Sequence, residues 1–275
     1  MATPIIKWVG GKRQLLDKIK EKLPEKYETY YEPFFGGGAV FFEISPEKAI
    51  INDFNIQLIN LYKQIQKQPK RVINYLIDYQ NKYNSLSDIK EKDKYYLDVR
   101  DEFNNHISKK ILNSKTAALF IFLNKSGFNG LYRVNAKGLF NVPSAHKKTL
   151  NTFDEENIYA VSNALKKCKI EQSDFESACE NAKKGDLVFF DSPYYDTFDT
   201  YQAGGFSEND HIRLFNLFKK LSKNGVYCIL TNSNTDFIKE LYKDYNIEIV
   251  DVKRMINCDA SKRTGTEVII TNFKK

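Results

Sequence analysis

The feature that most constrains the fold is an apolar run that ends in a short polar motif. Residues 186–190 read Asp-Leu-Val-Phe-Phe, a composition typical of a buried strand. The motif Asp191-Ser192-Pro193-Tyr194 follows directly. Because ligands of open α/β sheets bind beyond the carboxyl ends of the strands, we predict a ligand site at this motif. A carboxylate, a rigid proline and an aromatic ring suit the binding of a flat ring that carries an amino group.

Hydrophobic periodicity predicts an α/β sheet interrupted by a helical insertion. Expected strands lie near residues 30–34, 49–53, 169–172, 187–190 and 226–231, with a closing antiparallel pair at 247–254 and 267–272. Expected helices lie at residues 11–23, around 40–42, and at 155–167, 208–222 and 236–243. Residues 56–122 have a helical, highly charged pattern, whereas residues 124–150 are rich in Asn, Gly and Lys and predict an ordered loop or small hairpin.

Length and composition narrow the class of protein. A chain of 275 residues allows one large domain or two modest ones. Four cysteines without C-x-x-C spacing and three scattered histidines argue against a zinc site or a disulfide framework. No amino-terminal apolar segment or long uncharged run is present, so we expect a soluble cytoplasmic protein without a membrane partner.

The positive charge is concentrated in the middle of the chain. Residues 1–58 have no net charge, residues 59–155 have a net charge of +8, and residues 156–275 have a net charge of −1. This distribution indicates a polyanionic partner for the middle segment. A competing interpretation is a lysine-rich, solvated helical surface.

A glycine-rich turn follows the first expected strand. Gly36-Gly37-Gly38 lies between that strand and a helix, where backbone N–H groups can meet a phosphate or carboxylate. Asp53 ends the next strand, the position at which an acid commonly binds a pair of ribose hydroxyls. A competing interpretation makes Asp53 a helix N-cap, with Asn55 as the neighbouring candidate.

A second cluster precedes the first expected helix. Residues 7–12 read Lys-Trp-Val-Gly-Gly-Lys and contain the only tryptophan of the chain. Two cations and two glycines at a helix entrance favour contact with an anion or a nucleotide. Alternatively, Trp8 is a buried anchor for the amino-terminal arm.

Together these segments resemble the DNA adenine methylases, the Dam-like D12 class of N6-adenine methyltransferases that use S-adenosylmethionine. The matching motifs, in the order of the family, are residues 7–12, 32–38 (Glu-Pro-Phe-Phe-Gly-Gly-Gly), 52–55 (Asn-Asp-Phe-Asn), 122–135, 138–143 and 191–194. The resemblance implies a Rossmann-like catalytic domain formed by residues 1–58 and 156–275. It also implies a helical target-recognition domain formed by residues 59–155.

The resemblance implies a set of site residues and no metal. The catalytic residues would be Asp191, Ser192, Pro193 and Tyr194. The cofactor contacts would be Trp8, Gly10, Lys12, Glu32, Pro33, Phe34, Gly36, Gly38, Asp53, Ser173, Asp174, Phe175 and Asp191. The DNA contacts would be Lys7, Lys125, Phe128, Asn129, Leu131, Arg133, His146, Lys147 and Lys148. Residues 195–207 would form a flap that orders on DNA binding.

The implied reaction moves a methyl group from S-adenosylmethionine to N6 of an adenine in duplex DNA, with GATC as the expected target. The adenine must leave the duplex to reach such a site. Asp191 and the Ser192 carbonyl would accept the amino hydrogens, and Tyr194 would stack on the base. Arg133 would offer a bidentate pair to guanine or contact a phosphate instead. Phe128 would fill the gap left by the extruded base.

One departure from the family motif leaves alternatives open. The family usually has proline where this chain has Ser192, and serine is less rigid. A catalytically weak or inactive DNA-binding relative is therefore one alternative. An RNA or N4-cytosine methyltransferase is another that does not depend on Ser192, because the same fold could serve an RNA enzyme and cytosine presents a similar amino group. The expected assembly is a monomer or weak dimer, with a companion restriction endonuclease as a possible partner.

Overall fold

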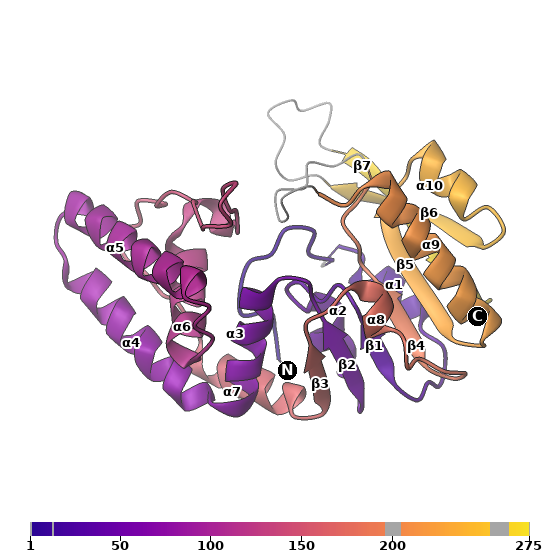
Figure 1. The fold of residues 1–275 in the computed structure, drawn as a ribbon, viewed down its shortest axis with the longest axis horizontal. Helices are drawn as coiled ribbons and strands as arrows, with labels where there is room; N and C mark the ends of the chain where they lie inside the picture. The colour runs from indigo at the N-terminus through magenta and orange to yellow at the C-terminus, as the bar shows by residue number, and fades with distance from the viewer. Residues whose placement is uncertain (1, 13, 196–204, 254–263, 275) are drawn as a thin grey trace.

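The architecture is an open, mainly parallel α/β sheet with a helical body attached to it (Figure 1). The computed structural model describes residues 2–12, 14–195, 205–253 and 264–274. Its strands are β1 (Tyr30–Glu32), β2 (Ala49–Asn52), β3 (Cys168–Glu171), β4 (Leu187–Phe190), β5 (Tyr227–Ser233), β6 (Asn246–Lys253) and β7 (Thr264–Thr271). They form a seven-stranded sheet in the order β3-β2-β1-β4-β5-β7-β6, in which β7 is antiparallel to β5 and β6.

The order of the strands places the candidate site. From β1 the chain adds β2 and β3 on one side and then returns to add β4 on the other side of β1. The carboxyl ends of β1 and β4 therefore flank the point where the order reverses, which is the ligand-binding crevice of open α/β sheets. The motif that begins at Asp191 lies at this crevice.

Alternation along the strands gives the sheet an apolar core on each face. Leu187 and Phe189 of β4 belong to one buried cluster, and Val188 and Phe190 belong to the other, because successive side chains of a strand point to opposite faces.

The helices are α1 (Leu16–Lys22), α2 (Ala39–Ile44), α3 (Ile56–Lys67), α4 (Pro69–Ser85), α5 (Ile89–Ser108), α6 (Ser114–Ser126), α7 (Glu155–Leu165), α8 (Phe175–Ala178), α9 (Glu208–Lys223) and α10 (Asp236–Leu241). The second cluster is covered by α8, α9 and α10, and the first by α1, α2 and α3.

The helical body comprises α3 to α7 and residues 127–154. Helix α6 lies at its centre and packs against α3, α4 and α5. The apolar cluster on the α3 side of the sheet continues through Leu58 and Ile65 into Phe120 of α6. The helical body and the sheet thus share a continuous core, and the division into domains at residues 58 and 155 stays a prediction.

Several expected boundaries were wrong for local reasons. The first helix begins at Leu16 instead of residue 11, because Gly10 adopts a positive φ and a turn joins Lys12 to Leu15. The first strand ends at Glu32, since Pro33 follows and has no N–H to donate to a ladder. The long helical stretch is four helices, one break falling at Pro69, and α8 was not expected at all. Residues 127–144 do form a small hairpin-like region, closed by isolated bridges at Gly127–Ser144 and Val134–Phe140.

The described residues contain no helix with the length and apolar character needed to span a membrane. Within the same part of the chain, no group of three or more His, Cys, Asp or Glu side chains is placed to bind a metal ion. The described cysteines, Cys168, Cys179 and Cys228, are free thiols.

Two adjacent residues of α4 provide a test of the helical core. Leu76 is fully buried, whereas Ile77 is 37% exposed. We expect Leu76→Ala to lower the free energy of unfolding by about 2–5 kcal/mol. We expect Ile77→Ala, the matched control, to lower it by less than about 1 kcal/mol. Denaturant titration measures both, and equal losses would show that α4 is packed differently.

Candidate active site

The Asp191 carboxylate is held by two side chains from other parts of the chain. Lys12 Nζ lies 2.6 Å from Asp191 Oδ1, and the Thr231 hydroxyl of β5 donates to the same oxygen at 3.0 Å. The Lys12 side chain is 5% exposed and that of Asp191 is 20% exposed. Burial raises the pKa of Asp191, and the adjacent Lys12 ammonium opposes that rise.

The residues after Asp191 are held by side chains of β5 and β7. Ser192 is buried, and Asn232 Nδ2 approaches its hydroxyl oxygen at 3.4 Å. Asn232 Oδ1 accepts the Tyr195 N–H at 3.0 Å. The Tyr194 hydroxyl donates to Glu267 Oε2 at 2.6 Å. These bonds hold Ser192, Tyr194 and Tyr195 on either side of Pro193, which is half-buried.

The Tyr194 ring is also part of the charged cluster. Lys12 Nζ lies 4.6 Å from the centre of the ring, a cation–π geometry. Burial, together with the negative charges of Asp191 and Glu267, raises the pKa of Tyr194 well above its usual value. The hydroxyl is therefore a neutral donor to Glu267. Lys12, Asp191 and Tyr194 form one compact group at the end of β4.

A single asparagine joins the loops after β1 and β3. Asn52, buried at the end of β2, donates from Nδ2 to the carbonyls of Pro33 and Ser173, each at 3.0 Å. Its Oδ1 accepts the Ser173 N–H at 2.8 Å. The structure thereby brings together two of the segments that the sequence predicted to bind a cofactor.

Asp53 closes the glycine turn. Its Oδ2 accepts the Gly36 N–H and its Oδ1 accepts the Asn55 N–H, both at 2.9 Å. Burial raises the pKa of Asp53 to about 6, although both backbone bonds act in the opposite direction. Asn55 is the N-cap of α3, so the cap interpretation holds for Asn55 and not for Asp53.

Glu32 lies deeper than the other acids. It is 2% exposed and accepts a hydrogen bond from the Tyr30 hydroxyl at 2.7 Å. Burial is the main reason that the pKa of Glu32 is raised well above its usual value. Its role as a cofactor contact stays a prediction.

Aromatic rings line the ends of β1 and β3. Phe34 stacks on Phe175 with ring centres 5.4 Å apart, and Phe206 meets Phe34 edge-on at 5.8 Å. The Arg213 guanidinium lies over the Phe175 ring, 4.8 Å from its centre, and binds Asp174 at 2.9 Å. The predicted residues 173–175 therefore do lie beside Phe34.

Trp8 stands against the glycine turn. A Cβ on Gly36 would lie 2.8 Å from Trp8 Cδ1, so the turn approaches the indole too closely for a side chain. Gly38 has a φ of +69°, and a Cβ there would lie 2.5 Å from Phe35. Trp8 also packs on Tyr132, with ring centres 5.7 Å apart. Trp8 is thus a packing anchor that also borders the predicted cofactor turn, which is compatible with both interpretations.

The predicted DNA contacts lie in the helical body, apart from Lys7, which lies in the amino-terminal arm (residues 3–12). Phe128, Asn129 and Arg133 are exposed, and Leu131 is half-buried. Arg133 Nε donates to Asn141 Oδ1 at 2.8 Å, which orients its guanidinium. Asn129 has a φ of +54° in the short helix η1 (Phe128–Gly130).

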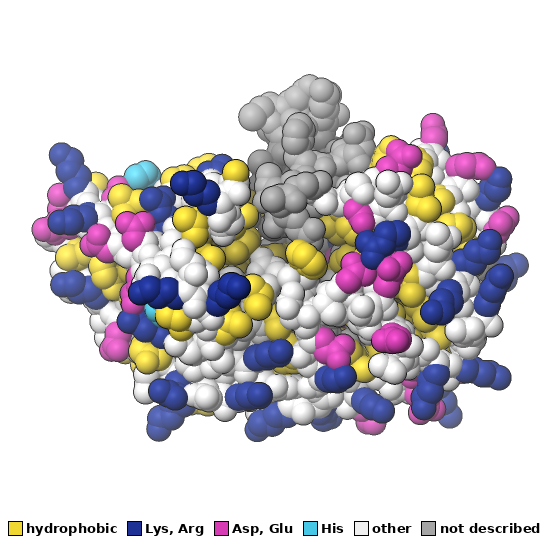
Figure 2. Space-filling view, in the orientation of Figure 1, with side chains coloured by type: hydrophobic (Ala, Val, Ile, Leu, Met, Phe, Trp, Pro, Cys, Tyr) yellow, Lys and Arg dark blue, Asp and Glu magenta, His cyan; other side chains and the backbone are white. Residues whose placement is uncertain are grey.

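The basic residues at 146–148 have partners of their own. His146 Nδ1 lies 2.6 Å from Asp93 Oδ2, and the Lys147 ammonium donates to the Lys125 carbonyl at 2.6 Å. Burial and the nearby Lys7 lower the pKa of Lys147. Lys148 is exposed, and its carbonyl accepts a bond from the Lys92 ammonium. On the face drawn in Figure 2, Lys and Arg side chains are spread over both halves of the molecule, so charge does not outline a binding surface on that face.

Most of the flap predicted at residues 195–207, including Gly204, lies outside the described residues. The sequence analysis assigned no role to five side chains that hold the site: Asn52 and Asn124, which lie in the matched motifs 52–55 and 122–135, and Thr231, Asn232 and Glu267, which lie outside them. Asn124 binds the Lys7 backbone. One signal was available for two of them. Thr231 and Asn232 follow the apolar residues 228–230, just as the polar motif follows β4.

Fold and site together define an α/β protein with a buried, paired carboxylate, Asp191, at the reversal of strand order. Residues 8–256 match the family model of the D12 class N6 adenine-specific DNA methyltransferases, and the chain belongs to that family. It is an adenine-specific DNA methyltransferase with the α/β fold of S-adenosylmethionine-dependent methyltransferases. The family implies DNA as substrate and a methyl donor as cofactor.

Curated relatives match the chain over nearly its whole length. It is 41% identical over 278 residues to Type II methyltransferase M1.LlaDCHI of Lactococcus lactis subsp. cremoris, which covers 98% of this chain and 95% of the relative. It is also 41% identical over 287 residues to Type II methyltransferase M.MjaIII of Methanocaldococcus jannaschii, with 98% and 99% covered. The DNA adenine methylase of Haemophilus influenzae is 31% identical over 276 residues, with 98% and 93% covered.

The buried pair predicts a pH-dependent loss of stability. Lys12→Met leaves the Asp191 carboxylate without its cation, so we expect about 3–5 kcal/mol less stability at neutral pH. The loss raises the pKa of folded Asp191 further. A raised pKa favours the protonated form, so the defect shrinks as the pH falls and grows as the pH rises through that pKa.

Unfolding by denaturant at several pH values measures this effect. Asp191→Asn should relieve the defect of Lys12→Met, because no charge is then left unpaired. Lys20→Met is the matched control, since its pair with Glu43 is largely exposed and should contribute little. A defect that does not vary with pH would contradict this account of the pair.

Proposed function

We propose that this enzyme transfers the methyl group of S-adenosylmethionine to N6 of the adenine in GATC, after that adenine has left the duplex. The observation that carries the proposal is the Asp191 carboxylate at the end of β4, bound by Lys12 and Thr231 and adjacent to Tyr194. In this group the Asp191 carboxylate can accept a hydrogen bond from an amino group, and the Tyr194 ring can stack on the flat base that carries it.

The residues around β1, β2 and β3 fit S-adenosylmethionine. Its sulfonium is positive, and the carboxylates of Asp53 and Asp191 lie at these strand ends. The stacked pair Phe34–Phe175 offers aromatic faces for a purine. The residues that would hold the cofactor are Trp8, Gly10, Lys12, Glu32, Pro33, Phe34, Gly36, Gly38, Asp53, Ser173, Asp174, Phe175 and Asp191. When bound, the cofactor supplies an electrophilic methyl group on a good leaving group.

Asp191 and Ser192 would orient the amine. The lone pair of the adenine amino nitrogen is delocalised into the ring, so its direction must be set by hydrogen bonds. Among the described residues, both contacts to the Asp191 carboxylate fall on Oδ1, which leaves Oδ2 to accept one N–H. The Ser192 carbonyl accepts the other. The proton becomes acidic only as nitrogen bonds to carbon, and Asp191 or water takes it.

Tyr194 would hold the flipped base by stacking, a contact worth about 1–3 kcal/mol in related base–aromatic pairs. Its hydroxyl is tied to Glu267, which fixes the plane of the ring before the base arrives. Pro193 stiffens the backbone between the carbonyl that accepts the amine and this ring.

Residues 59–155, which form most of the helical body, would supply recognition as an inserted domain. Phe128, Asn129, Leu131 and Arg133 would read or open the duplex, with Arg133 held toward guanine by Asn141. Lys7 would contact the same region. The groups that would contact phosphates are Lys125, His146, Lys147 and Lys148. The resemblance of residues 122–135 to the family supports GATC, and the Type II relatives support a companion restriction endonuclease.

Substitution of Asp191 tests the chemical proposal. We expect wild-type protein to transfer labelled methyl from S-adenosylmethionine to a GATC duplex and not to RNA or to a duplex that lacks adenine in the site. We expect Asp191→Ala to reduce turnover to less than about a tenth of wild type because amine orientation is lost. Duplex binding should be largely preserved in Asp191→Ala and in the isosteric Asp191→Asn. Turnover above that level, or methyl recovered on cytosine, would refute the proposed role.

The salt dependence of binding tests the helical body as the DNA surface. Replacing Lys125, Lys147 and Lys148 by Gln should weaken binding to every duplex. It should also reduce the slope of log K against log salt by up to about 0.9 for each phosphate contact removed. Replacing Lys219, Lys220 and Lys223 of α9 by Gln is the matched control. An unchanged slope for the first variant would count against this surface.

A further inference from the structure

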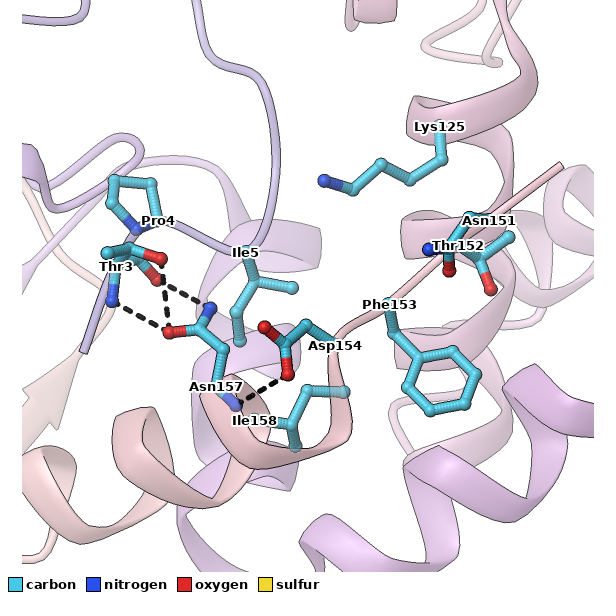
Figure 3. Close-up of a pocket in the computed structure, with 10 residues that line it drawn as sticks. All are labelled: Thr3, Pro4, Ile5, Lys125, Asn151, Thr152, Phe153, Asp154, Asn157 and Ile158. Atoms are coloured by element: carbon cyan, nitrogen blue, oxygen red, sulfur yellow. Dashed lines mark hydrogen bonds between the residues drawn. The ribbon is translucent and has the colours of Figure 1, made fainter. Parts of the chain in front are cut away.

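Two asparagines hold the amino-terminal arm, residues 3–12, against the helical body. Asn157 of α7 accepts the Thr3 N–H at 2.8 Å and donates to the Thr3 carbonyl at 3.0 Å (Figure 3). Asn124 of α6 accepts the Lys7 N–H and donates to the Lys7 carbonyl, both at 2.9 Å. Each asparagine side chain thus binds both the N–H and the carbonyl of one residue of the arm, as a neighbouring strand would.

Residues 3–5 of the arm border a cavity on the Asn157 side. This cavity of about 260 Å³ lies under the arm and is lined by residues that include Ile5, Lys125 and Asn157 (Figure 3). Asn157 thus holds the arm at Thr3 and Asn124 holds it at Lys7. A substitution can therefore remove one of these contacts and leave the other in place.

Asn124 differs from Asn157 in one respect. Its Nδ2 also donates to the Gly130 carbonyl at 2.7 Å, and the side chain is 1% exposed. Gly130 in turn packs on the stem of Lys7, since a Cβ there would lie 2.7 Å from Lys7 Cδ. One buried amide therefore holds both the arm and the segment 128–133.

From Lys7 the arm continues to the Asp191 carboxylate. After Lys7, Trp8 packs between Tyr132 and the glycine turn at Gly36. The arm ends at Lys12, which binds Asp191. A displacement of Gly130 is thus linked by packed groups to the position of the Lys12 ammonium.

We propose that Asn124 is a positioning residue that couples segment 128–133 to the arm, so that correct docking of this segment on DNA sets Lys12 and Asp191 for methyl transfer. The inference rests on the proposed function, in which segment 128–133 reads the target. An amide is required here because one oxygen accepts an N–H while the nitrogen donates to two carbonyls. An aspartate at this position would have no N–H to donate, so its carboxylate oxygen would face the carbonyls of Lys7 and Gly130.

The test compares Asn124→Asp and Asn124→Ala with Asn157→Asp, which loosens the same arm without contact to segment 128–133. The readout is the single-turnover rate of methyl transfer to a GATC duplex, divided by the rate for a duplex with one base pair of the site changed. We expect both Asn124 variants to lower this ratio at least about tenfold, as expected when induced fit is lost. The Asn157 variant should keep the wild-type ratio. Binding of S-adenosylmethionine, measured by equilibrium dialysis, should change little in all three.

A double-mutant cycle with Arg133→Ala separates coupling from simple loss of structure. In wild type, Arg133→Ala should reduce the transfer rate at the cognate site, and this penalty should be smaller in the Asn124→Ala background. Equal penalties, or an Asn124 ratio that matches Asn157→Asp, would overturn the inference. If wild type modifies another sequence, the same ratio is measured on that sequence, so failure of the GATC assignment is distinguished from failure of the coupling.

Discussion

The buried ion pair between Lys12 and Asp191 is the interaction on which the site depends. It joins the first residues of the chain to the end of β4, a strand at the centre of the sheet. Burial alone would drive the carboxylate toward its neutral form, and a neutral acid accepts hydrogen bonds poorly. The Lys12 ammonium and the Thr231 hydroxyl oppose that shift. Lys12, at the end of the arm, therefore favours the charged form of the carboxylate that we propose to receive the substrate amine.

The sequence predicted the parts of the fold that depend on local patterns. The apolar run 187–190 was enough to predict β4, and the polar motif after it does lie at the carboxyl end of that strand; its role as a ligand site stays a prediction. The glycine turn at Gly36–Gly38 and the acid at Asp53 were found in the same way. In each case the informative residues are adjacent in sequence to the strand that positions them.

The bonds that hold these parts together join residues far apart in the chain. Tyr194 and Glu267 are 73 positions apart, Asn52 and Ser173 are 121 apart, and Lys7 and Asn124 are 117 apart. Periodicity describes only neighbours along one element, so it cannot pair these residues. The helix boundary at Leu16 and the cap at Asn55 were uncertain for a related reason, because several nearby residues could satisfy the same local rule.

Ser192 shows how the structure accommodates a departure from the family motif. Serine lacks the ring that restricts the backbone of proline. Here its hydroxyl is buried and faces Asn232, which also accepts the N–H of Tyr195. Beyond the motif, Tyr195 stacks on Phe237 with ring centres 4.4 Å apart. The motif is thus fixed by Lys12 and Thr231 at its start and by β5 and β7 at its end, so its shape does not depend on a second proline. The carbonyl of Ser192 is held in place by these contacts, and it is the carbonyl that the proposed reaction requires.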